Sequence, residues 1–205
     1  MEKVKLVLNV GINDADYSVT KEEKINGKRI VTWRCPYYSR WYNLLSRCYS
    51  KAALTKRPLY GECSICSEWL VFSNFKSWMI TQDWENKQLD KDLKILGNKI
   101  YSPDTCLFIS DDLNRFLNEN ESKRGNYPIG VTAKSGKFAS YVGNKHISYH
   151  ETPESAHESW LIHKMKMIDG WMIKEPNVSV YLQNYKNLLN SYLIEHKIYD
   201  GRRSI

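Results

Sequence analysis

Acidic, basic and amide side chains follow one another between residues 90 and 114, in a combination that phosphodiester hydrolysis could use. Asp90, Lys91 and Asp92 are consecutive, and Asn98 and Asn114 come after them. Hydrolysis of a phosphodiester needs a base that activates water and a divalent metal ion that stabilises the leaving oxyanion. Carboxylate and amide oxygens are ligands of such ions. The stretch is therefore a candidate for metal-dependent hydrolysis.

Two short strands, a turn and a helix are expected to position these side chains. Residues 89–93 and 106–109 are strand candidates, and Gly97-Asn98 is a turn signal between them. Ser110 is a good N-cap for a helix that runs to about residue 118, because its hydroxyl can accept from a free backbone N–H of the first turn. Asp111 and Asp112 follow at the positive end of the helix dipole. The pattern predicts a ββα unit.

This segment resembles the catalytic ββα segment of HNH-type DNA endonucleases. The matching residues are Leu89–Asp92, Gly97–Lys99, Tyr101–Cys106 and Asn114. Upstream, the chain is similar to the HNH-like endonucleases common in bacteriophage genomes at Cys35–Tyr38, Trp41, Arg47–Tyr49, Cys66, Glu68–Trp69, Phe72–Phe75 and Trp78–Met79. The resemblance implies a homing-type endonuclease that is encoded by a phage, acts in the cytoplasm of a bacterial host, and cuts or nicks double-stranded DNA.

The same resemblance implies a role for each polar residue of the segment. Asp90 would bind the metal ion, Mg²⁺ or Mn²⁺, from the first strand, and Asn114 would lie near that ion on the helix. Asn98 would structure the loop. Lys91 stands where the family usually keeps its histidine base, and Asp92 is a second carboxylate beside it.

A lysine in the histidine position leaves two interpretations of the activity open. Lysine stays charged at neutral pH and is a poor general base unless its pKa is strongly lowered. Burial beside a metal could lower that pKa, or Asp92 could take the proton instead. All five histidines lie after residue 145, so none belongs to the ββα segment. The alternative is a catalytically degenerate HNH fold that binds DNA as a phage regulator or an anti-host-defence factor.

A polar stretch at residues 119–126 predicts a linker, because no hydrophobic side chain occurs there. The predicted domains are an HNH-like module with N-terminal strands (1–118), the linker, and a second module (127–205). Three strands are expected in the second module, at 129–133, 137–142 and 146–150. A helix follows with Thr152 as N-cap and Pro153 at its first position, and a last helix spans about 178–196.

The second module resembles the APETALA-type DNA-binding domain that is often fused behind phage homing endonucleases. Tyr127–Val131, Gly136–Phe138 and Thr152–His157 carry the match, while Ser148–His150 replaces the usual glycine-aromatic pair before the helix. The resemblance implies a sheet that lies in the major groove, with lysines on phosphates and other side chains at base edges. The candidate DNA contacts are Lys134, Lys137, Tyr141, Lys145 and His146.

The N-terminal region is expected to mix strands and helices, so the whole chain should have an α+β fold. Residues 3–10 have strand character, and Asn26-Gly27 predicts a hairpin. Apolar residues at helical spacing predict helices over about 38–49 and 67–81, with a polar loop at 50–60 between them. The expected order is an HNH-like ββα-containing module, a three-stranded sheet plus helix, and a C-terminal helix.

Four cysteines are a candidate structural zinc site. Cys63 and Cys66 form a CxxC pair, and Cys48 and Cys106 could complete four thiolate ligands if the fold brings them together. No second CxxC pair is present, so free or buried thiols are the alternative. Reduced thiols are the default inside cells.

Composition favours a nucleic-acid partner. The chain has a net charge of +7 and a pI near 9.0, with 14 Tyr and 7 Trp. A basic surface attracts polyanions, of which DNA and RNA are the commonest. The alternatives are an ordinary solvated surface and a basic inhibitor that binds an acidic protein.

No stretch approaches the ~20 apolar residues of a membrane span, and the N-terminus does not look like a signal peptide. The apolar stripe of the last helix could also pair two copies as a homodimer.

Overall fold

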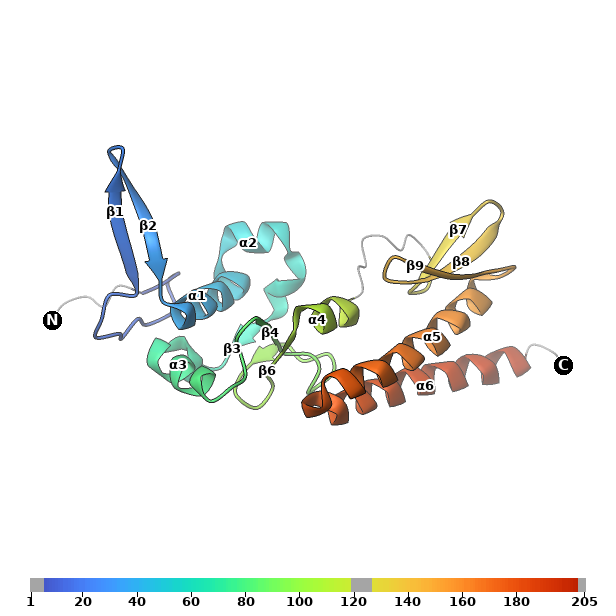
Figure 1. The fold of residues 1–205 in the computed structure, drawn as a ribbon. Coiled ribbons are helices and arrows are strands. Elements are labelled where there is room, and N and C mark those ends of the chain that lie inside the picture. Colours follow the sequence, from blue (N-terminus) through green and yellow to red (C-terminus); the bar gives the residue numbers. More distant parts are fainter. Residues whose placement is uncertain (1–5, 119–126, 203–205) are drawn as a thin grey trace. The chain divides into compact units, whose positions relative to one another are not determined.

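The computed structural model describes residues 6–118 and 127–202, and the chain divides into two compact units, 1–108 and 109–205. The described residues form an α+β fold with four small sheets (Figure 1). The linker predicted at 119–126 lies outside the described residues. Each unit has its own sheets and helices, so the two are described in turn.

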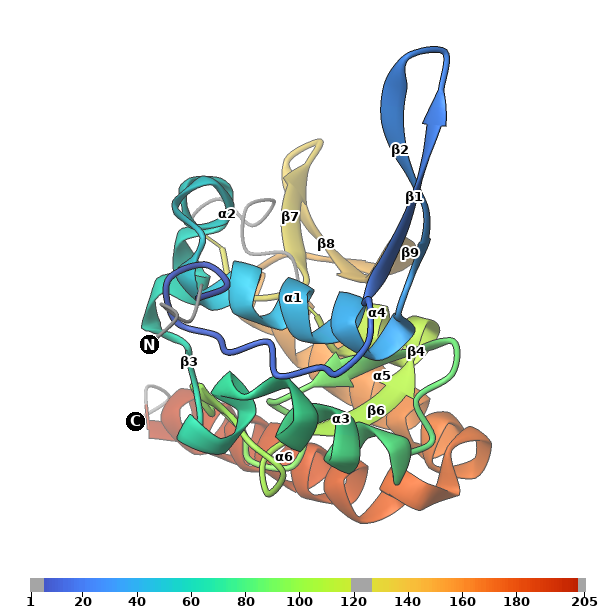
Figure 2. The ribbon, with the colours of Figure 1, turned by 90° about the vertical axis from the view of Figure 1, so that its left-hand side faces the viewer.

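The first unit begins with an antiparallel ribbon of β1 (Thr20–Ile25) and β2 (Lys28–Arg34). The turn residues Asn26 and Gly27 have φ angles of 49° and 78°, which a two-residue type I′ hairpin turn requires. The predicted hairpin is therefore confirmed. The ribbon extends away from the helices of its own unit (Figures 1 and 2), and nearly all of its residues are exposed.

Three predictions for the first unit were wrong in detail. Residues 7–11 form a turn closed by a bridge between Val7 and Gly11, so no strand runs through the described part of 3–10. The region 50–60 is helical, with α2 (Lys51–Lys56) followed by a 3-10 turn (Pro58–Glu62), because lysine, alanine and leucine favour a helix.

The helix predicted over 67–81 is divided in two. A 3-10 turn at Ser67–Leu70 is followed by α3 (Phe72–Ile80). Between them, Ile12 donates to the Leu70 carbonyl at 2.7 Å and accepts from the Phe72 N–H at 2.9 Å. The N-terminal segment therefore pairs with the chain at Val71 and delays the start of the α-helix.

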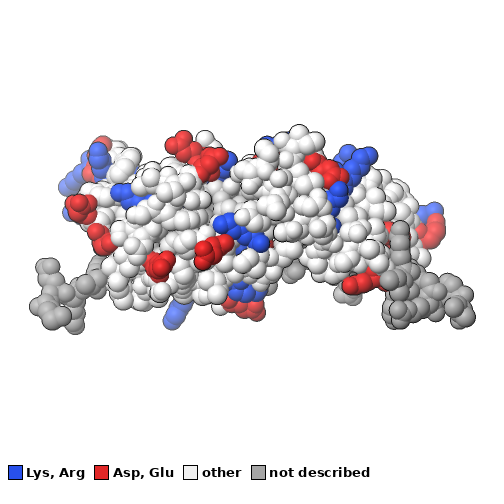
Figure 3. All heavy atoms as spheres, turned by 90° about the horizontal axis from the view of Figure 1, so that it is seen from below, with Lys and Arg blue, Asp and Glu red and all other residues white. Residues whose placement is uncertain are grey.

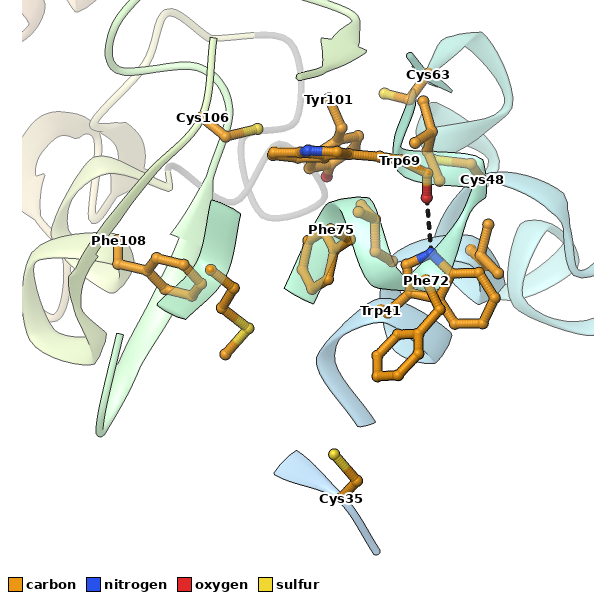
Figure 4. Packing of buried hydrophobic residues seen from close by; sticks show 14 residues of the cluster. Cys35, Trp41, Cys48, Cys63, Trp69, Phe72, Phe75, Tyr101, Cys106 and Phe108 are labelled. Carbon is orange, nitrogen blue, oxygen red and sulfur yellow. Dashed lines mark hydrogen bonds between the residues drawn. The ribbon is translucent and has the colours of Figure 1, made fainter. Parts of the chain in front are cut away.

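Two tryptophans join the helices of the first unit in a single core. Trp41 lies on α1 (Pro36–Tyr49), and its indole N–H donates to the Trp69 carbonyl at 2.7 Å (Figure 4). Both side chains are buried, and rings of Phe72 and Phe75 pack against them at centroid distances of 5.5 and 5.1 Å. A bonded indole in an aromatic core satisfies its polar atom while burying a large apolar surface.

Two short strand pairs lie between residues 64 and 110. β3 (Ser64–Ile65) pairs in parallel with β5 (Ile100–Tyr101), and β4 (Lys87–Asp90) pairs with β6 (Leu107–Ser110). The strands predicted at 89–93 and 106–109 are thus present with shifted ends. The boundary between the two units falls within β6, after Phe108.

The second unit holds a three-stranded antiparallel sheet and two long helices. The sheet consists of β7 (Val131–Lys134), β8 (Lys137–Val142) and β9 (Lys145–His150), which confirms the three predicted strands. α5 (Pro153–Lys174) packs on the sheet, and α6 (Ser179–Arg202) runs alongside α5 (Figure 1). The Thr152 hydroxyl accepts from the Ser155 N–H at 3.2 Å, which confirms the predicted N-cap.

The last helix buries most of its predicted stripe within the chain itself. Leu182, Leu189 and Leu193 are buried, whereas Tyr192 is 44% exposed. Pairing of two copies through this helix stays a prediction.

Helix α4 (Asp111–Leu117) is held on α5 at both of its ends. Its predicted N-cap is confirmed, since the Ser110 hydroxyl accepts from the Leu113 N–H at 3.1 Å and also donates to Glu175. At the other end, the fully buried Lys164 donates to the Phe116 carbonyl and lies 3.9 Å from the Phe116 ring centroid. Helix α4 therefore belongs to the second unit.

We predict that Gly130→Ala destabilises the protein more than Gly136→Ala. Both glycines have a φ of 78°, so each substitution places alanine in the left-handed region. At Gly130 the added Cβ would also lie 2.0 Å from Cδ1 of Trp160, whereas nothing lies within 4 Å at Gly136. Strain alone costs about 1–2 kcal/mol, and overpacking adds about 1–3 kcal/mol. Urea denaturation of both variants measures the difference, and equal losses would contradict the packing described here.

Candidate functional site

The Asp90 carboxylate closes the turn that follows β4. Its Oδ1 atom accepts from the backbone N–H groups of Asp92 and Leu93 at 2.9 and 2.7 Å. The residue is 9% exposed, and burial raises the pKa of its carboxyl group, an effect that the Leu93 N–H partly offsets. One oxygen of the predicted metal ligand is therefore occupied in stabilising the backbone of the loop.

Lys91 is held in place inside the same loop. Its Nζ atom donates to Asp92 Oδ1 at 2.5 Å and to the Asn98 carbonyl at 2.7 Å, and the residue is only 7% exposed. An ammonium group has three donors and no acceptor, so in this ion-paired form it cannot take a proton from water. The contacts give Lys91 a structural role in joining the two ends of the loop.

Asn98 completes the loop through its side-chain amide. Its Nδ2 atom donates to the carbonyls of Lys91 and Ile100 at 2.9 and 2.6 Å, and its Oδ1 atom accepts from the Ile100 N–H at 3.1 Å. Three bonds from one side chain connect the end of β4 to the start of β5. We name residues 90–100 the lysine loop, because Lys91 and Asn98 together define its conformation.

Asn114 belongs to the second unit, on α4. Its carbonyl and its Oδ1 atom accept from the Asn118 side-chain amide at 2.8 and 3.1 Å. The two predicted metal ligands, Asp90 and Asn114, thus lie in different units. Binding of Mg²⁺ or Mn²⁺ by these residues stays a prediction.

The four cysteines of the candidate zinc site all lie in the first unit, and zinc binding by them stays a prediction. No group of three or more His, Cys, Asp or Glu side chains that could hold a metal ion is found in the described residues. Figure 4 draws Cys106 on the opposite side of the Trp69 ring from Cys48 and Cys63. Burial raises the pKa of the Cys48 and Cys106 thiols to about 12, so both are protonated at neutral pH.

The register of the three-stranded sheet places most of the predicted DNA contacts on one face. Lys134 pairs with Lys137 and Tyr141 pairs with His146, and paired residues point to the same side. Tyr149 pairs with Ala139, two positions before Tyr141, so its ring lies on this side as well. We name the face formed by Lys134, Lys137, Tyr141, His146 and Tyr149 the exposed sheet face.

The opposite face of the sheet is covered by α5. Hydroxyl groups of Ser140 and Ser148 lie within 3.4 Å of the Ser159 hydroxyl on that helix. Lys145 pairs with Val142, which is buried, and so begins on the α5 side of the ladder. Of the five predicted contacts, Lys145 is the one that the register separates from the others.

Three rings form a row along the exposed sheet face. The centroids of Tyr141 and His146 are 5.2 Å apart, and those of His146 and Tyr149 are 4.5 Å apart. Tyr149 is 50% exposed although it packs on His146. Tyr149 is not among the predicted DNA contacts, since Ser148–His150 departs from the pattern of the family that the second module resembles. Regular alternation along β9 would place Tyr149 and His146 on opposite faces, because they are three positions apart. A register shift opposite Ser140 and Tyr141 brings the two rings to the same face.

Two lysines lie directly opposite each other on the same face. Like charges in a cross-strand pair repel and cost stability unless an anion lies near them. Lys137 has such a partner, since it donates to Glu151 at 2.6 Å, and this bond raises the pKa of the Lys137 ammonium. Lys134 is exposed and is the better placed of the two to contact a phosphate.

Charge is mixed over the face of the molecule that Figure 3 shows. Lysine and arginine side chains alternate there with aspartate and glutamate, so the net charge of +7 is not gathered on that face. No helix among the described residues has the length and apolar content that crossing a membrane requires.

Comparisons with protein-family models, with curated proteins and with solved structures found no match to this chain.

We predict that Cys48 and Cys106 resist alkylation in the folded protein. At about pH 8 their raised pKa values keep both groups as thiols, which are poor nucleophiles. Labelling by iodoacetamide, followed by mass spectrometry, should be slow in the native state and complete in urea, with the partly exposed Cys66 as the internal comparison. Labelling of Cys106 as fast as in urea would refute its burial.

The same raised pKa values predict how stability depends on pH. Folding raises these thiol pKa values from 9.0 to about 12, so their contribution is fully present below about pH 9. That contribution is lost as the pH rises from about 9 to 12, because the unfolded chain ionises first.

Proposed function

We propose that the protein binds double-stranded DNA through the exposed sheet face of its second unit. The observation that carries this proposal is the row of Tyr141, His146 and Tyr149 beside the Lys134–Lys137 pair, on the face that α5 leaves uncovered. Rings and cations on one side of a sheet supply the two kinds of contact that duplex recognition needs.

Each group has a role that follows from its chemistry. Lys134 contacts a phosphate and thereby releases condensed counterions, which favours binding at low salt. His146 can donate or accept a hydrogen bond at a base edge, and the tyrosine hydroxyls can do the same. The rings also offer apolar surface to a thymine methyl group. Phosphate contacts position the sheet in the groove, and the ring row provides the discrimination between sequences.

The lysine loop favours binding without cleavage. A nuclease of the HNH kind needs a group that accepts a proton from water. Lys91 donates to Asp92 and to the Asn98 carbonyl, and Asp92, the other candidate base, is ion-paired with Lys91. We therefore prefer the catalytically degenerate interpretation, in which the ββα segment is a scaffold and the protein acts as a regulator on DNA. Metal-dependent cleavage stays a prediction with its own test.

Replacing Tyr149 should weaken DNA binding, whereas replacing Tyr192 should not. Both tyrosines belong to the second unit and have similar exposure, 50% and 44%, but Tyr192 lies on α6. A good base-edge contact is worth about 1–3 kcal/mol, so Tyr149→Ala should lower affinity for a selected duplex by about 5- to 100-fold. Fluorescence anisotropy with a fragment selected from random duplexes measures the change. Equal affinities for Tyr149→Ala and Tyr192→Ala would overturn the proposed face.

Replacing Lys134 should weaken binding to all duplex sequences alike. Lys134→Gln removes one phosphate contact, so affinity should fall less steeply with salt. The magnitude of the slope of log affinity against log salt should decrease by about 1. Lys166→Gln makes the same charge change at an exposed position of α5 and should leave the slope unaltered. A slope that falls equally in both variants would indicate a general charge effect.

Incubation with DNA and Mg²⁺ or Mn²⁺ should give binding but no discrete cuts. The matched variant is Asp90→Asn, because the amide oxygen can still accept from Asp92 and Leu93 while the charge is removed. Cuts that disappear both with chelator and in Asp90→Asn would show that the lysine loop is a nuclease centre after all.

A further inference from the structure

A second basic feature lies in the first unit, far along the chain from the exposed sheet face. A cavity of about 470 Å³ opens between α1, α2 and the 3-10 turn that follows α2. Its polar lining comes from Asn43, Ser46, Arg47, Ser50, Lys56, Arg57 and Tyr60. No aspartate or glutamate lines it.

No carboxylate of the described residues pairs with the cations of this cavity. Among the described residues, none of the ion pairs involves Arg47, Lys56 or Arg57. Arg47 lies close to Tyr101, and its charge adds to the effect of burial in lowering the pKa of Arg40. Several positive charges thus lie close together around a hollow, an arrangement that an anion would stabilise.

The kinds of donor around the cavity suit a phosphate group. A guanidinium offers parallel N–H donors that bind two oxygens of a phosphate at once, and a lysine ammonium adds a point charge. Hydroxyl groups of Ser46 and Tyr60 can donate to the remaining oxygens. The opening of the cavity to solvent allows a group attached to a larger molecule to enter.

We propose that this cavity is a phosphate-binding site that takes a backbone phosphate of bound DNA. The phosphate chemistry rests on the lining alone, while DNA as its source rests on the proposed function. The occupied cavity would add a contact from the first unit to those of the exposed sheet face. Each phosphate neutralised contributes about 0.9 to the salt dependence of duplex binding.

Inorganic phosphate tests the site without DNA. At constant ionic strength, replacing chloride by phosphate should raise the Tm of the wild-type protein by about 2–4 °C near saturation, because the anion binds the folded state. Lys56→Gln and Arg57→Gln should each lose most of this rise. Lys51→Gln is the matched control, since Lys51 is exposed on the same helix α2 but does not line the cavity. The same rise in all four proteins, or in none, would overturn the site.

Duplex binding then tests the source of the phosphate. The magnitude of the slope of log affinity against log salt should decrease by about 0.9 in Lys56→Gln and in Arg57→Gln. In Lys51→Gln it should stay as in the wild type. A lost Tm rise with an unchanged slope would overturn DNA as the source and leave a site for free phosphate.

The failure of the proposed function has a different signature. If the wild-type protein does not bind duplex DNA at all, two proposals are wrong: DNA binding by the exposed sheet face, and DNA as the source of the phosphate. The phosphate-dependent rise in Tm still tests whether the cavity binds phosphate. If Tyr149→Ala weakens DNA binding while the cavity variants behave as the wild type in both assays, the exposed sheet face stands and the cavity proposal falls.

Discussion

The close contact between Gly130 and the indole of Trp160 determines how the second unit presents its sheet. A Cβ at position 130 would lie 2.0 Å from the Trp160 ring, so the backbone touches the aromatic face directly. His157 stacks on the same indole and bonds to the Ile129 carbonyl at 2.8 Å, which holds the start of β7 on α5. Because one face of the sheet is sealed in this way, the other face is left for Tyr141, His146 and Tyr149.

In the first unit, the corresponding constraint is the bond from Trp41 to the Trp69 carbonyl. It joins α1 to the segment before α3 inside an aromatic core. The strands on either side of the lysine loop contribute Leu89 and Tyr101 to the same core. The loop itself is closed by its own polar groups. Asn98 bonds to backbone on both sides, and Lys91 joins Asp92 to the Asn98 carbonyl. Both contacts of Lys91 use it as a donor, so the side chain joins the two ends of the loop.

Under the proposed function, the local structure of this segment and its chemistry are separate properties. The strand, turn and strand arrangement depends on apolar spacing and on one asparagine, and both are present. The chemistry depends on a base with a free lone pair and on a metal ligand with free oxygens. Asp90 has one oxygen committed to two backbone N–H groups, and Lys91 is committed as a donor.

Local signals in the sequence were sufficient for several elements. The Asn26-Gly27 turn, the Ser110 and Thr152 caps and the three strands of the second unit follow from short-range rules, and the structure has them. Four of the five residues selected for DNA contact also share one face, because strand pairing alternates side chains in a regular way. The α+β class followed from the same patterns.

Tertiary structure alone decided the rest, since the deciding contacts join residues far apart in the chain. The pairing of Ile12 with Leu70 and Phe72 divided a helix that periodicity had predicted as continuous. Burial of Lys164 against Phe116 assigned α4 to the second unit. The register shift between β8 and β9 brought Tyr149 to the exposed sheet face. Sequence spacing determined which local elements form, whereas packing between distant residues determined which side chains they present together.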